Sequence, residues 1–488
     1  MAKEDFGITV KKHKDFSDWF TQVNQKAELT DLRYNVQGFV VHMPWAVKIT
    51  RRIYDLFNEE VEKDGHEPLL FPTVIPEENL TKESEHAGFV PDVFWVEKAG
   101  DEKLEKRLAL RPTGETAFYP MYSLWIRSYK DLPFKRYQTE ITTFRNEKTT
   151  RPFIRGREFM FFETHDVFAT HEESFIQIKK DMEIMDKVVK EKLHIPFIFF
   201  QRPFWDKFKG AKDTFASDTL LPDGKTIQIS STHDLAQKFA IPFEVSFTDK
   251  DEQKKYGWQT CFGPGIWRIM ASLISIHGDD TGLILPFDIA PTQIIIIPIT
   301  FSKNKTDSKK VLSKCKEIEK KLNEFRIKLD LSDNSPGFKF NKWELLGVPL
   351  RIEVGPKEAK SNKVTLVLRD TKEKIVIPIS KLNKEIEKQS KLLNKRLSQK
   401  AEIWFKSQIR TANSLEDLKL ILEKEKGFVK VNFCSMDKEG EKCSDILKEK
   451  TNGGSVRGTL FSKHEKAEGK CIICGNKANY LVYIAKSY

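Results

Sequence analysis

Two short segments, each placing an arginine beside strand-forming residues or a glycine-rich turn, constrain this sequence most. They span Phe144–Glu147, with Arg155–Phe159 close behind it, and Cys261–Arg268. Burying an arginine costs free energy unless an anion meets it. A triphosphate is a suitable anion, because the guanidinium stays charged at any working pH and its planar fork matches phosphate oxygens. The pattern therefore predicts a fold that directs arginines toward an anionic ligand.

The charge of the chain is concentrated in one segment. The sequence of 488 residues, long enough for about three domains, has a net charge of +11. Residues 301–400 hold 26 Lys and Arg against 13 Asp and Glu, a net of +13, so the rest is close to neutral. This excess predicts a localised contact with a polyanion that weakens with salt. A lysine-rich surface without a ligand is the alternative.

The hydrophobic pattern predicts mixed α and β structure in the first 290 residues. Helical periodicity covers 44–63 and 171–192, and a helix starts near residue 265 after the glycines. Strand-like stretches cover 67–72, 108–111, 138–145, 159–162, 195–201 and 225–231. Runs of strands with helices packed to one side predict an α+β antiparallel sheet.

A linker at 285–291 precedes a change of pattern. Strands are predicted at 292–299, 326–331, 349–354, 363–369 and 374–378, with helices at 308–325 and from 380. This alternation predicts a separate small α/β domain. From residue 401 the chain is predicted to be helical and then loop-rich. We expect domains at 1–288, 289–400 and 401–488.

Cysteine usage indicates a metal site near the end of the chain. Four of the six cysteines fall in the last 55 residues, and Cys471 and Cys474 form a knuckle followed by glycine. Cys434 and Cys443 are spaced more widely than is usual for a zinc pair. We predict a structural four-cysteine zinc site, and free thiols without metal are the alternative.

The location predicted from the sequence is the cytoplasm. The sequence has no run of 18 apolar residues, so no membrane span is predicted. The polar segment 1–5 does not resemble a secretory signal. The cytoplasm keeps thiols reduced, which favours metal binding over disulfides for the terminal cysteines.

Both arginine segments resemble motifs 2 and 3 of class II aminoacyl-tRNA synthetases, and in detail the prolyl-tRNA synthetases. The resemblance runs over nearly the whole chain. It also rests on Arg111–Glu115, Phe161–His165, His277–Leu283, Trp343–Glu344, Gly347–Pro349, Glu353–Pro356 and Ala485–Tyr488. Their joint order is far more specific than any one motif. Helix 44–63 and the strand ending at Pro72 resemble motif 1, the dimer element of the class, although an ordinary helix and strand would give the same periodicity.

The spacing of the motifs resembles the archaeal and eukaryotic type of the family. Only 95 residues separate His165 from Cys261, which leaves no room for the editing domain that bacterial-type members insert between motifs 2 and 3. The resemblance implies a class II antiparallel sheet with flanking helices, then an α/β anticodon-binding domain and a small C-terminal α/β zinc-type domain. It also implies a homodimer.

The resemblance implies ATP-dependent ligation of L-proline to tRNA(Pro). Proline would first form prolyl-adenylate with release of pyrophosphate, and the prolyl group would then move to the 3′-terminal adenosine. Arg145 and Arg268 match the arginines that hold the phosphates, with Mg²⁺ bridging these. The residues that match nucleotide contacts are Arg145, Glu147, Arg155, Gln228, Thr232 and Arg268.

A snug apolar slot with an anchor for the amine is expected to select proline. The residues that match this slot are Thr113, Glu115, Arg145, Phe161, Glu163, His165, Phe208, Ser231 and His233. From the pattern alone, Phe161 and Phe208 are equally consistent with core packing. His165 alone would be interpreted as a hydrogen-bonded core histidine that orients its neighbours.

The basic α/β segment resembles the anticodon-binding domain of the family. Glu344 and Arg351 match residues that read the proline anticodon, since carboxylates and arginines can bond guanine edges. A solvated strand end with a salt bridge is the alternative for both. Tyr488 matches the terminal tyrosine that packs back toward the catalytic domain.

Three other functions stay open on the sequence. One is a different class II synthetase, such as the threonyl or seryl enzyme, which the Thr113/Glu115 and Phe161–His165 elements disfavour. Another is a non-catalytic RNA-binding paralogue, which would have no use for Arg145, Glu147 and Arg268. The last is a zinc-stabilised RNA-binding regulator.

Overall fold

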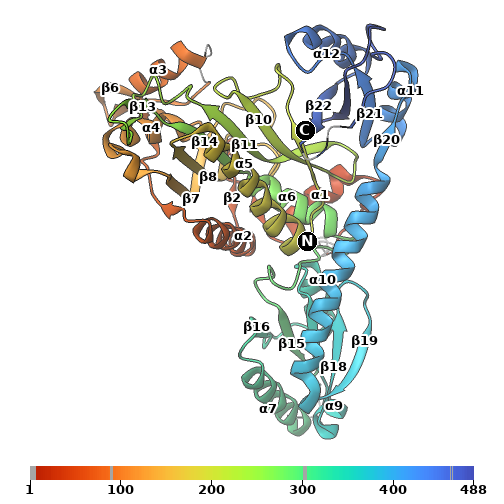
Figure 1. Cartoon of the computed structure of the whole chain (residues 1–488). Coiled ribbons are helices and arrows are strands. Elements are labelled where there is room, and N and C mark those ends of the chain that lie inside the picture. Colours follow the sequence, from red (N-terminus) through yellow and green to blue (C-terminus); the bar gives the residue numbers. More distant parts are fainter. Residues whose placement is uncertain (1–6, 88–91, 301–304, 462, 464) are drawn as a thin grey trace.

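The computed structural model describes residues 7–87, 92–300, 305–461, 463 and 465–488. A broad body and a narrower lower lobe are joined by the long helix α10 (Leu382–Ser407), which runs up along one side (Figure 1). In the described residues no helix is long and apolar enough to span a membrane. Segment 1–5, on which the prediction of no secretory signal rests, lies outside the described residues.

An 11-stranded, largely antiparallel sheet forms the centre of the body. Its strands in spatial order are β20 (Ile409–Thr411), β21 (Phe428–Phe433), β23 (Tyr480–Lys486), β22 (Gly454–Leu460), β9 (Ile198–Gln201), β10 (Asp213–Leu220), β11 (Thr226–Ala236), β14 (Trp258–Pro264), β8 (Glu158–Phe168), β7 (Phe134–Phe144) and β3 (Glu67–Pro68). The predicted α+β antiparallel architecture is confirmed. Strand β14 was not predicted.

Four helices share one apolar core with this sheet. They are α1 (Phe16–Lys26), α2 (Pro44–Lys63), α5 (His171–Met185) and α6 (Ile266–His277). Strand alternation sends Phe162 and Phe262 into this core, so their neighbours Phe161 and Gly263 lie on the opposite face. The candidate site lies on that opposite face. The predicted helix 171–192 is correct in extent, although its last turns from Asp186 to Lys192 are π-helical.

Smaller elements complete this part of the body. A three-stranded sheet has the order β4 (Val74–Pro76), β6 (Glu102–Leu110) and β5 (Trp95–Ala99), with α3 (Glu77–Ala87) and α4 (Glu115–Trp125) beside it. Two hairpins are formed by β1 (Thr30–Asp31) with β2 (Val41–His42), and by β12 (Ser246–Thr248) with β13 (Lys254–Tyr256). A 3-10 turn spans Tyr129–Asp131.

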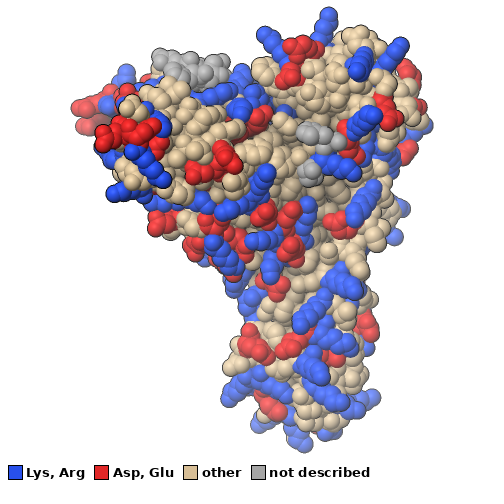
Figure 2. Space-filling view, in the orientation of Figure 1, with Lys and Arg blue, Asp and Glu red and all other residues tan. Residues whose placement is uncertain are grey.

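The lower lobe is a five-stranded mixed sheet with helices, as predicted. Its strands in spatial order are β16 (Ile327–Leu329), β15 (Ile294–Pro298), β17 (Leu350–Val354), β18 (Lys363–Leu368) and β19 (Lys374–Pro378). Its helices are α7 (Lys305–Lys321), α8 (Pro336–Leu345) and α9 (Pro356–Ser361), with a 3-10 turn at Ile379–Lys381 before α10. A separate apolar core holds it together. Lysine and arginine cover much of its visible face (Figure 2).

The C-terminal part is α/β, as the resemblance implied, and differs only from the prediction made from the pattern alone. Instead of being helical and then loop-rich, it contributes β20 to β23, with α11 (Leu415–Leu420), a π-helical turn (Ile421–Glu425) and α12 (Lys438–Lys450). Thr459 and Leu460 of β22 pair with Gln201 and Phe200 of β9, so these strands extend the central sheet. Strand β20 has only three residues, and polar residues interrupt β21 and β22, so periodicity detects these three strands poorly.

Candidate active site

Two connected cavities open on the face of the sheet opposite the helical core. One, of about 130 Å³, is lined by Arg145, Glu147, Arg155, Gln228 and Arg268 among others, and is here called the arginine cavity. The other, of about 520 Å³, is lined by Thr113, Glu115, Phe208, His233 and Cys261 among others, and is here called the slot. Both cavities are lined by Arg145, Glu147, Phe161, Ser231 and Gly263.

Three guanidinium groups line the arginine cavity with little neutralisation. Arg155 pairs with Glu147 at 3.4 Å, while Arg268 donates to the main-chain oxygens of Ile154 (3.3 Å) and Gln228 (3.2 Å). Within the described chain, neither Arg145 nor Arg268 has a carboxylate within 4.0 Å. Burial, and then the charges of Arg145 and Arg155, lower the pKa of Arg268 to about 10. The cavity is therefore electrostatically suited to a polyanion.

Local backbone structure aims these arginines. Arg145 follows β7 directly, and its N–H donates to the carbonyl of Arg157 at 2.9 Å. Arg268 is in the first turn of α6, which begins after Gly265. A Cβ on Gly263 would lie 2.7 Å from the Phe161 ring. Only glycine lets that ring pack over the strand, which explains Gly263.

The slot combines apolar walls with one anionic corner. The hydroxyl of Thr113 donates to the carboxylate of Glu115, which is buried at the start of α4. Phe208 packs against His233, with ring centroids 5.1 Å apart. Burial lowers the pKa of His233 to about 3, so this histidine is neutral and accepts or donates single hydrogen bonds. The slot therefore suits a compact ligand with an apolar body and one cationic group.

Cys261 was not predicted as a site residue, yet it lines the slot beside Glu115. Burial raises the pKa of its thiol well above the usual range, so the group is an apolar wall rather than a nucleophile. The available signal was its position at the start of the second arginine segment. Strand register places it opposite both His165 and His233.

Glu163 and His165, predicted to contact the substrate, line neither cavity. Both are fully buried, and Glu163 accepts hydrogen bonds from His165 (3.0 Å), Gln138 and the main-chain N–H of Gly114 (3.2 Å). Burial lowers the pKa of His165, but the hydrogen bond and charge of Glu163 outweigh it and the net pKa is raised. Through the hydrogen bond to Gly114, the pair holds the Thr113–Glu115 segment in place. This agrees with the orienting role considered for His165.

Gln228, Ser231 and Thr232 divide between the two faces of β11. Gln228 lines the arginine cavity and Ser231 lines both cavities. Thr232, a predicted nucleotide contact, lines neither cavity. It is buried and pairs with Phe262, whose side chain enters the helical core. Alternation along the strand separates Ser231 from Thr232. Gln228 reaches the cavity side because the strand register shifts between it and Ser230.

The last residue of the chain reaches the arginine cavity. The Arg155 guanidinium donates to the Tyr488 main-chain oxygen at 2.9 Å, and the Tyr488 hydroxyl donates to Asp223 at 2.6 Å. The Tyr488 N–H also donates to the carbonyl of Thr226. Tyr488 therefore packs against the body, as its match to the family predicted.

In the lower lobe, Glu344 and Arg351 line one cavity of about 150 Å³ together with Arg369, Lys372 and Lys374. Each already has a partner: Lys372 donates to Glu344, and Arg351 pairs with Glu353 at 2.8 Å. Arg351 also lies 4.3 Å from the Phe340 ring centroid. Neighbouring cations and an aromatic ring suit an RNA base or phosphate.

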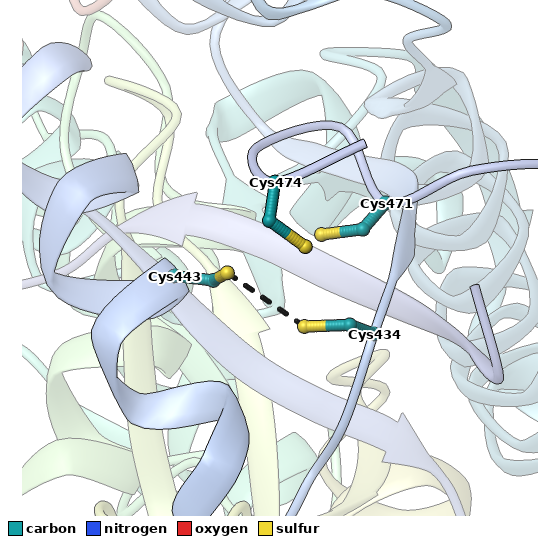
Figure 3. Close-up of side chains that lie close together, drawn as sticks. All are labelled: Cys434, Cys443, Cys471 and Cys474. Carbon is teal, nitrogen blue, oxygen red and sulfur yellow. Dashed lines mark hydrogen bonds between the residues drawn. The ribbon is translucent and has the colours of Figure 1, made fainter. Parts of the chain in front are cut away.

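The four terminal cysteines converge on one point (Figure 3). Cys434 follows β21, Cys443 is in α12, and Cys471 and Cys474 come from one turn. Their sulfur atoms all lie within 4.8 Å of one another, and those of Cys434 and Cys443 are 3.7 Å apart. Four convergent thiols suit a tetrahedral Zn²⁺ and leave no open position for catalysis.

Family models cover most of the chain. Residues 94–277 match the tRNA synthetase class II core domain (G, H, P, S and T), and residues 293–389 match an anticodon binding domain. Residues 415–488 match the C-terminal domain of prolyl-tRNA synthetase.

Full-length relatives and solved structures agree with these matches. The chain is 54% identical to a proline–tRNA ligase of Thermofilum pendens, with 99% of each chain covered. It is 40% identical to that of Pyrococcus horikoshii, with 97% and 98% covered. Among solved structures, Giardia lamblia prolyl-tRNA synthetase in complex with prolyl-adenylate superimposes with a TM-score of 0.94 at 36% identity, covering 99% of this chain and 100% of that one. The Cryptosporidium parvum enzyme, complexed with halofuginone and AMPPNP, gives 0.91 at 32%, covering 99% and 97%.

Proposed function

Because this chain belongs to the prolyl-tRNA synthetase family, we propose that it ligates L-proline to tRNA(Pro) with ATP, using the residues of the two connected cavities. The observation that supports this most is the junction of a cation-rich cavity and an apolar slot at Arg145. ATP in the first and proline in the second would bring the α-phosphate and the proline carboxylate together at this residue.

In the activation step, a proline carboxylate oxygen bonds to the α-phosphorus, and the bond from that phosphorus to the bridging oxygen of pyrophosphate breaks. The nucleophile is already an anion, so no general base is needed. Arg145 neutralises the two approaching anions, and Arg268 holds the terminal phosphates. Arg155 and Glu147 contact the base, and Gln228 and Ser231 contact the nucleotide sugar and the prolyl group.

Proline selection depends on the slot. Glu115 and Thr113 anchor the secondary ammonium, and Phe161, Phe208 and His233 enclose the ring. Glu163 and His165 hold the anchoring segment in place through Gly114. A snug pocket discriminates weakly against smaller amino acids, so binding of alanine or cysteine should be weaker rather than absent.

In the transfer step, a hydroxyl of the 3′-terminal adenosine attacks the prolyl carbonyl carbon and AMP leaves. The lower lobe binds the anticodon end of the tRNA, with Glu344 and Arg351 contacting bases and the surrounding lysines contacting phosphates. The RNA must displace Lys372 from Glu344 or bind beside this pair.

Two metal ions complete the proposal. The phosphates of ATP would hold Mg²⁺, and this ion would supply charge neutralisation for the pyrophosphate leaving group. Zn²⁺ is held by Cys434, Cys443, Cys471 and Cys474, a donor set that suits it, and stabilises the C-terminal part.

The domains 1–288, 289–400 and 401–488, the homodimer and the cytoplasmic location remain predictions. The second boundary falls inside α10, so this helix is shared by two domains. Motif 1 is the proposed dimer element. Leu70, just before Pro72, is 80% exposed, which supports a partner at this surface.

Exchange of labelled pyrophosphate into ATP, without tRNA and across all twenty amino acids, tests the function. Exchange with proline far above alanine and cysteine is expected. Exchange with a different amino acid would overturn the assigned substrate. No exchange with any amino acid would favour an RNA-binding paralogue.

A further inference from the structure

A buried group of charged side chains lies beside the arginine cavity and includes one residue from the C-terminal part. Asp218 of β10 accepts from both η nitrogens of Arg202, at 3.0 and 2.6 Å. It also accepts from Nε of Arg457 in β22, at 2.8 Å. The Arg202 guanidinium donates further to the side-chain oxygen of Gln228 at 3.0 Å. Arg457 is thus connected to a residue of the cavity through two side chains.

Backbone irregularities bring this group together. The pairing of β10 with β11 shifts register between Ser217 and Asp218, which leaves Ile229 without a partner and places Gln228 opposite Asp218. The pairing of β22 with β23 shifts between Val456 and Gly458, which leaves Arg457 as the extra residue. Bulges of this kind re-aim side chains near functional sites.

Gly458 allows β22 to approach closely enough for these contacts. Its φ is +127°, and a Cβ there would lie 2.0 Å from the carbonyl oxygen of Gln201. This approach also lets Arg202 donate to the carbonyl of Arg457 at 2.7 Å. The seam between the two parts of the sheet is therefore built around the two arginines.

The chemistry of arginine fixes the orientation of the Gln228 amide. A guanidinium has donors and no acceptor, so the amide must turn its oxygen to Arg202 and its NH₂ group elsewhere. The Gln228 main-chain oxygen is held separately by Arg268 at 3.2 Å. Gln228 lines the arginine cavity, and with its oxygen occupied it can offer N–H donors to a nucleotide oxygen.

Burying this group of charges costs free energy, and a purely structural role would not require that cost. The side chains of Asp218 and Arg202 are 0% and 1% exposed and that of Arg457 is 9% exposed, so two buried cations share one buried carboxylate. Well-packed apolar side chains would commonly join two sheets at least as stably. Burial raises the pKa of Asp218, but the charges of Arg202 and Arg457 outweigh this and keep it ionised.

We propose that Arg457 is a positioning residue for the nucleotide: through Asp218 and Arg202 it holds the Gln228 amide with its N–H groups toward bound ATP. The inference rests on the proposed function, because it takes the arginine cavity to be the ATP site. It gives the C-terminal part a direct role in the activation step, which needs no tRNA.

The test uses pyrophosphate exchange of the full-length protein without tRNA, with proline as the amino acid. Variants are Arg457→Met, which keeps side-chain length, and Gln228→Ala, together with their double mutant. Arg410→Met is the matched control, since Arg410 lies in the C-terminal part and pairs with Glu425 away from the cavity. Wild-type exchange with proline is measured first, so that failure of the proposed function is recognised separately.

For Arg457→Met, the KM for ATP should rise about five- to tenfold, as expected for one lost hydrogen-bonding contact. The KM for proline and kcat should stay within about twofold. The double mutant should be no worse than Gln228→Ala, because both changes remove the same contact. The control should match wild type.

Equal rises of both KM values, a fall in kcat alone, or additive effects in the double mutant would overturn the proposal. If Arg457→Met does not fold, Arg457→Lys replaces it. This variant keeps the charge and one donor, so it should raise the KM for ATP about two- to threefold and leave the KM for proline unchanged. An unchanged KM for ATP in a folded Arg457→Lys variant, with Gln228→Ala impaired, would likewise contradict it.

Discussion

Basic side chains line both the arginine cavity of the body and the cavity of the lower lobe. The two cavities differ in whether carboxylates neutralise these side chains. In the lower lobe, Arg351 pairs with Glu353 at 2.8 Å, and Lys372 donates to Glu344. In the body, Arg155 pairs with Glu147 at 3.4 Å, whereas Arg145 and Arg268 have no carboxylate within 4.0 Å in the described chain.

This difference matches the proposed tasks of the two cavities. A triphosphate entering the arginine cavity meets two cations, Arg145 and Arg268, that have no carboxylate to give up, so their full charge interaction is available at the reacting centre. RNA at the lower lobe must exchange existing partners, so each contact contributes less and affinity comes from many contacts. Arg145 and Arg268 are therefore free to meet the reacting anions, whereas Arg351 must first leave Glu353.

The largest expected effect is that of Arg145→Ala. Removing the cation shared by both cavities should lower proline-dependent pyrophosphate exchange about 10³-fold, the size found when a preorganised charge-stabilising donor is lost. Radiolabel exchange kinetics measure it. Near wild-type exchange would remove the distinction between the two cavities.

Glu344→Ala and Arg351→Ala should give a smaller effect confined to tRNA. Aminoacylation should fall about 10- to 100-fold, the cost of one base-specific contact, while exchange without tRNA stays within about twofold. Glu387→Ala, an exposed carboxylate on α10, is the control and should leave both assays unchanged. Equal loss of both steps would assign a structural role to Glu344 and Arg351.

Acidification should separate the two regions in stability. Burial lowers the pKa of His233 and His277 to about 3 and of His42 to about 4. Their unfolded pKa is near 6.5, so between that value and the folded pKa the unfolded chain binds more protons. Stability is therefore present above pH 6.5 and is lost as the pH falls, by about 2 kcal/mol per histidine at pH 5.

Two histidines of the body oppose this trend, as does Asp181, whose pKa is raised to about 8 by burial. The pKa values of His66 and His165 are raised, so their contribution is complete below pH 6.5. Residues 289–400 contain no histidine. Hydrogen exchange at pH 7 and pH 5, corrected for intrinsic rates, should show a net loss of protection in the body and little change in the lobe. Equal loss in both would contradict the assigned causes.

Sequence reasoning found what is local along the chain. The strand predicted at 138–145 is β7, and Arg145 follows it because aromatic and β-branched residues precede the arginine. The alternating pattern of the lower lobe was equally clear. Most of the predicted residues that line the arginine cavity and the slot belong to the motifs. Their roles were predicted from residue type and from the resemblance to the family.

What was missed depends on contacts between distant segments or on strand phase. Asp218 and Arg457 are 239 residues apart, and no periodicity connects them. Thr232 points into the core because strand alternation turns it away from Ser231. The four C-terminal strands extend an existing sheet at β9, so their formation depends on tertiary pairing as well as on local propensity.

Thermal unfolding without ligands tests the central claim most directly, by comparing Arg145→Ala with Arg369→Ala. Arg369 is buried and paired with Asp279 at 2.7 Å, so its removal should lower the midpoint by several degrees. Arg145 has no such partner in the described chain, so its removal should leave the midpoint unchanged or slightly higher. ATP with proline should then raise the midpoint of wild type but not of Arg145→Ala. A drop for Arg145→Ala as large as that for Arg369→Ala would contradict the claim that this arginine is held open for the substrate.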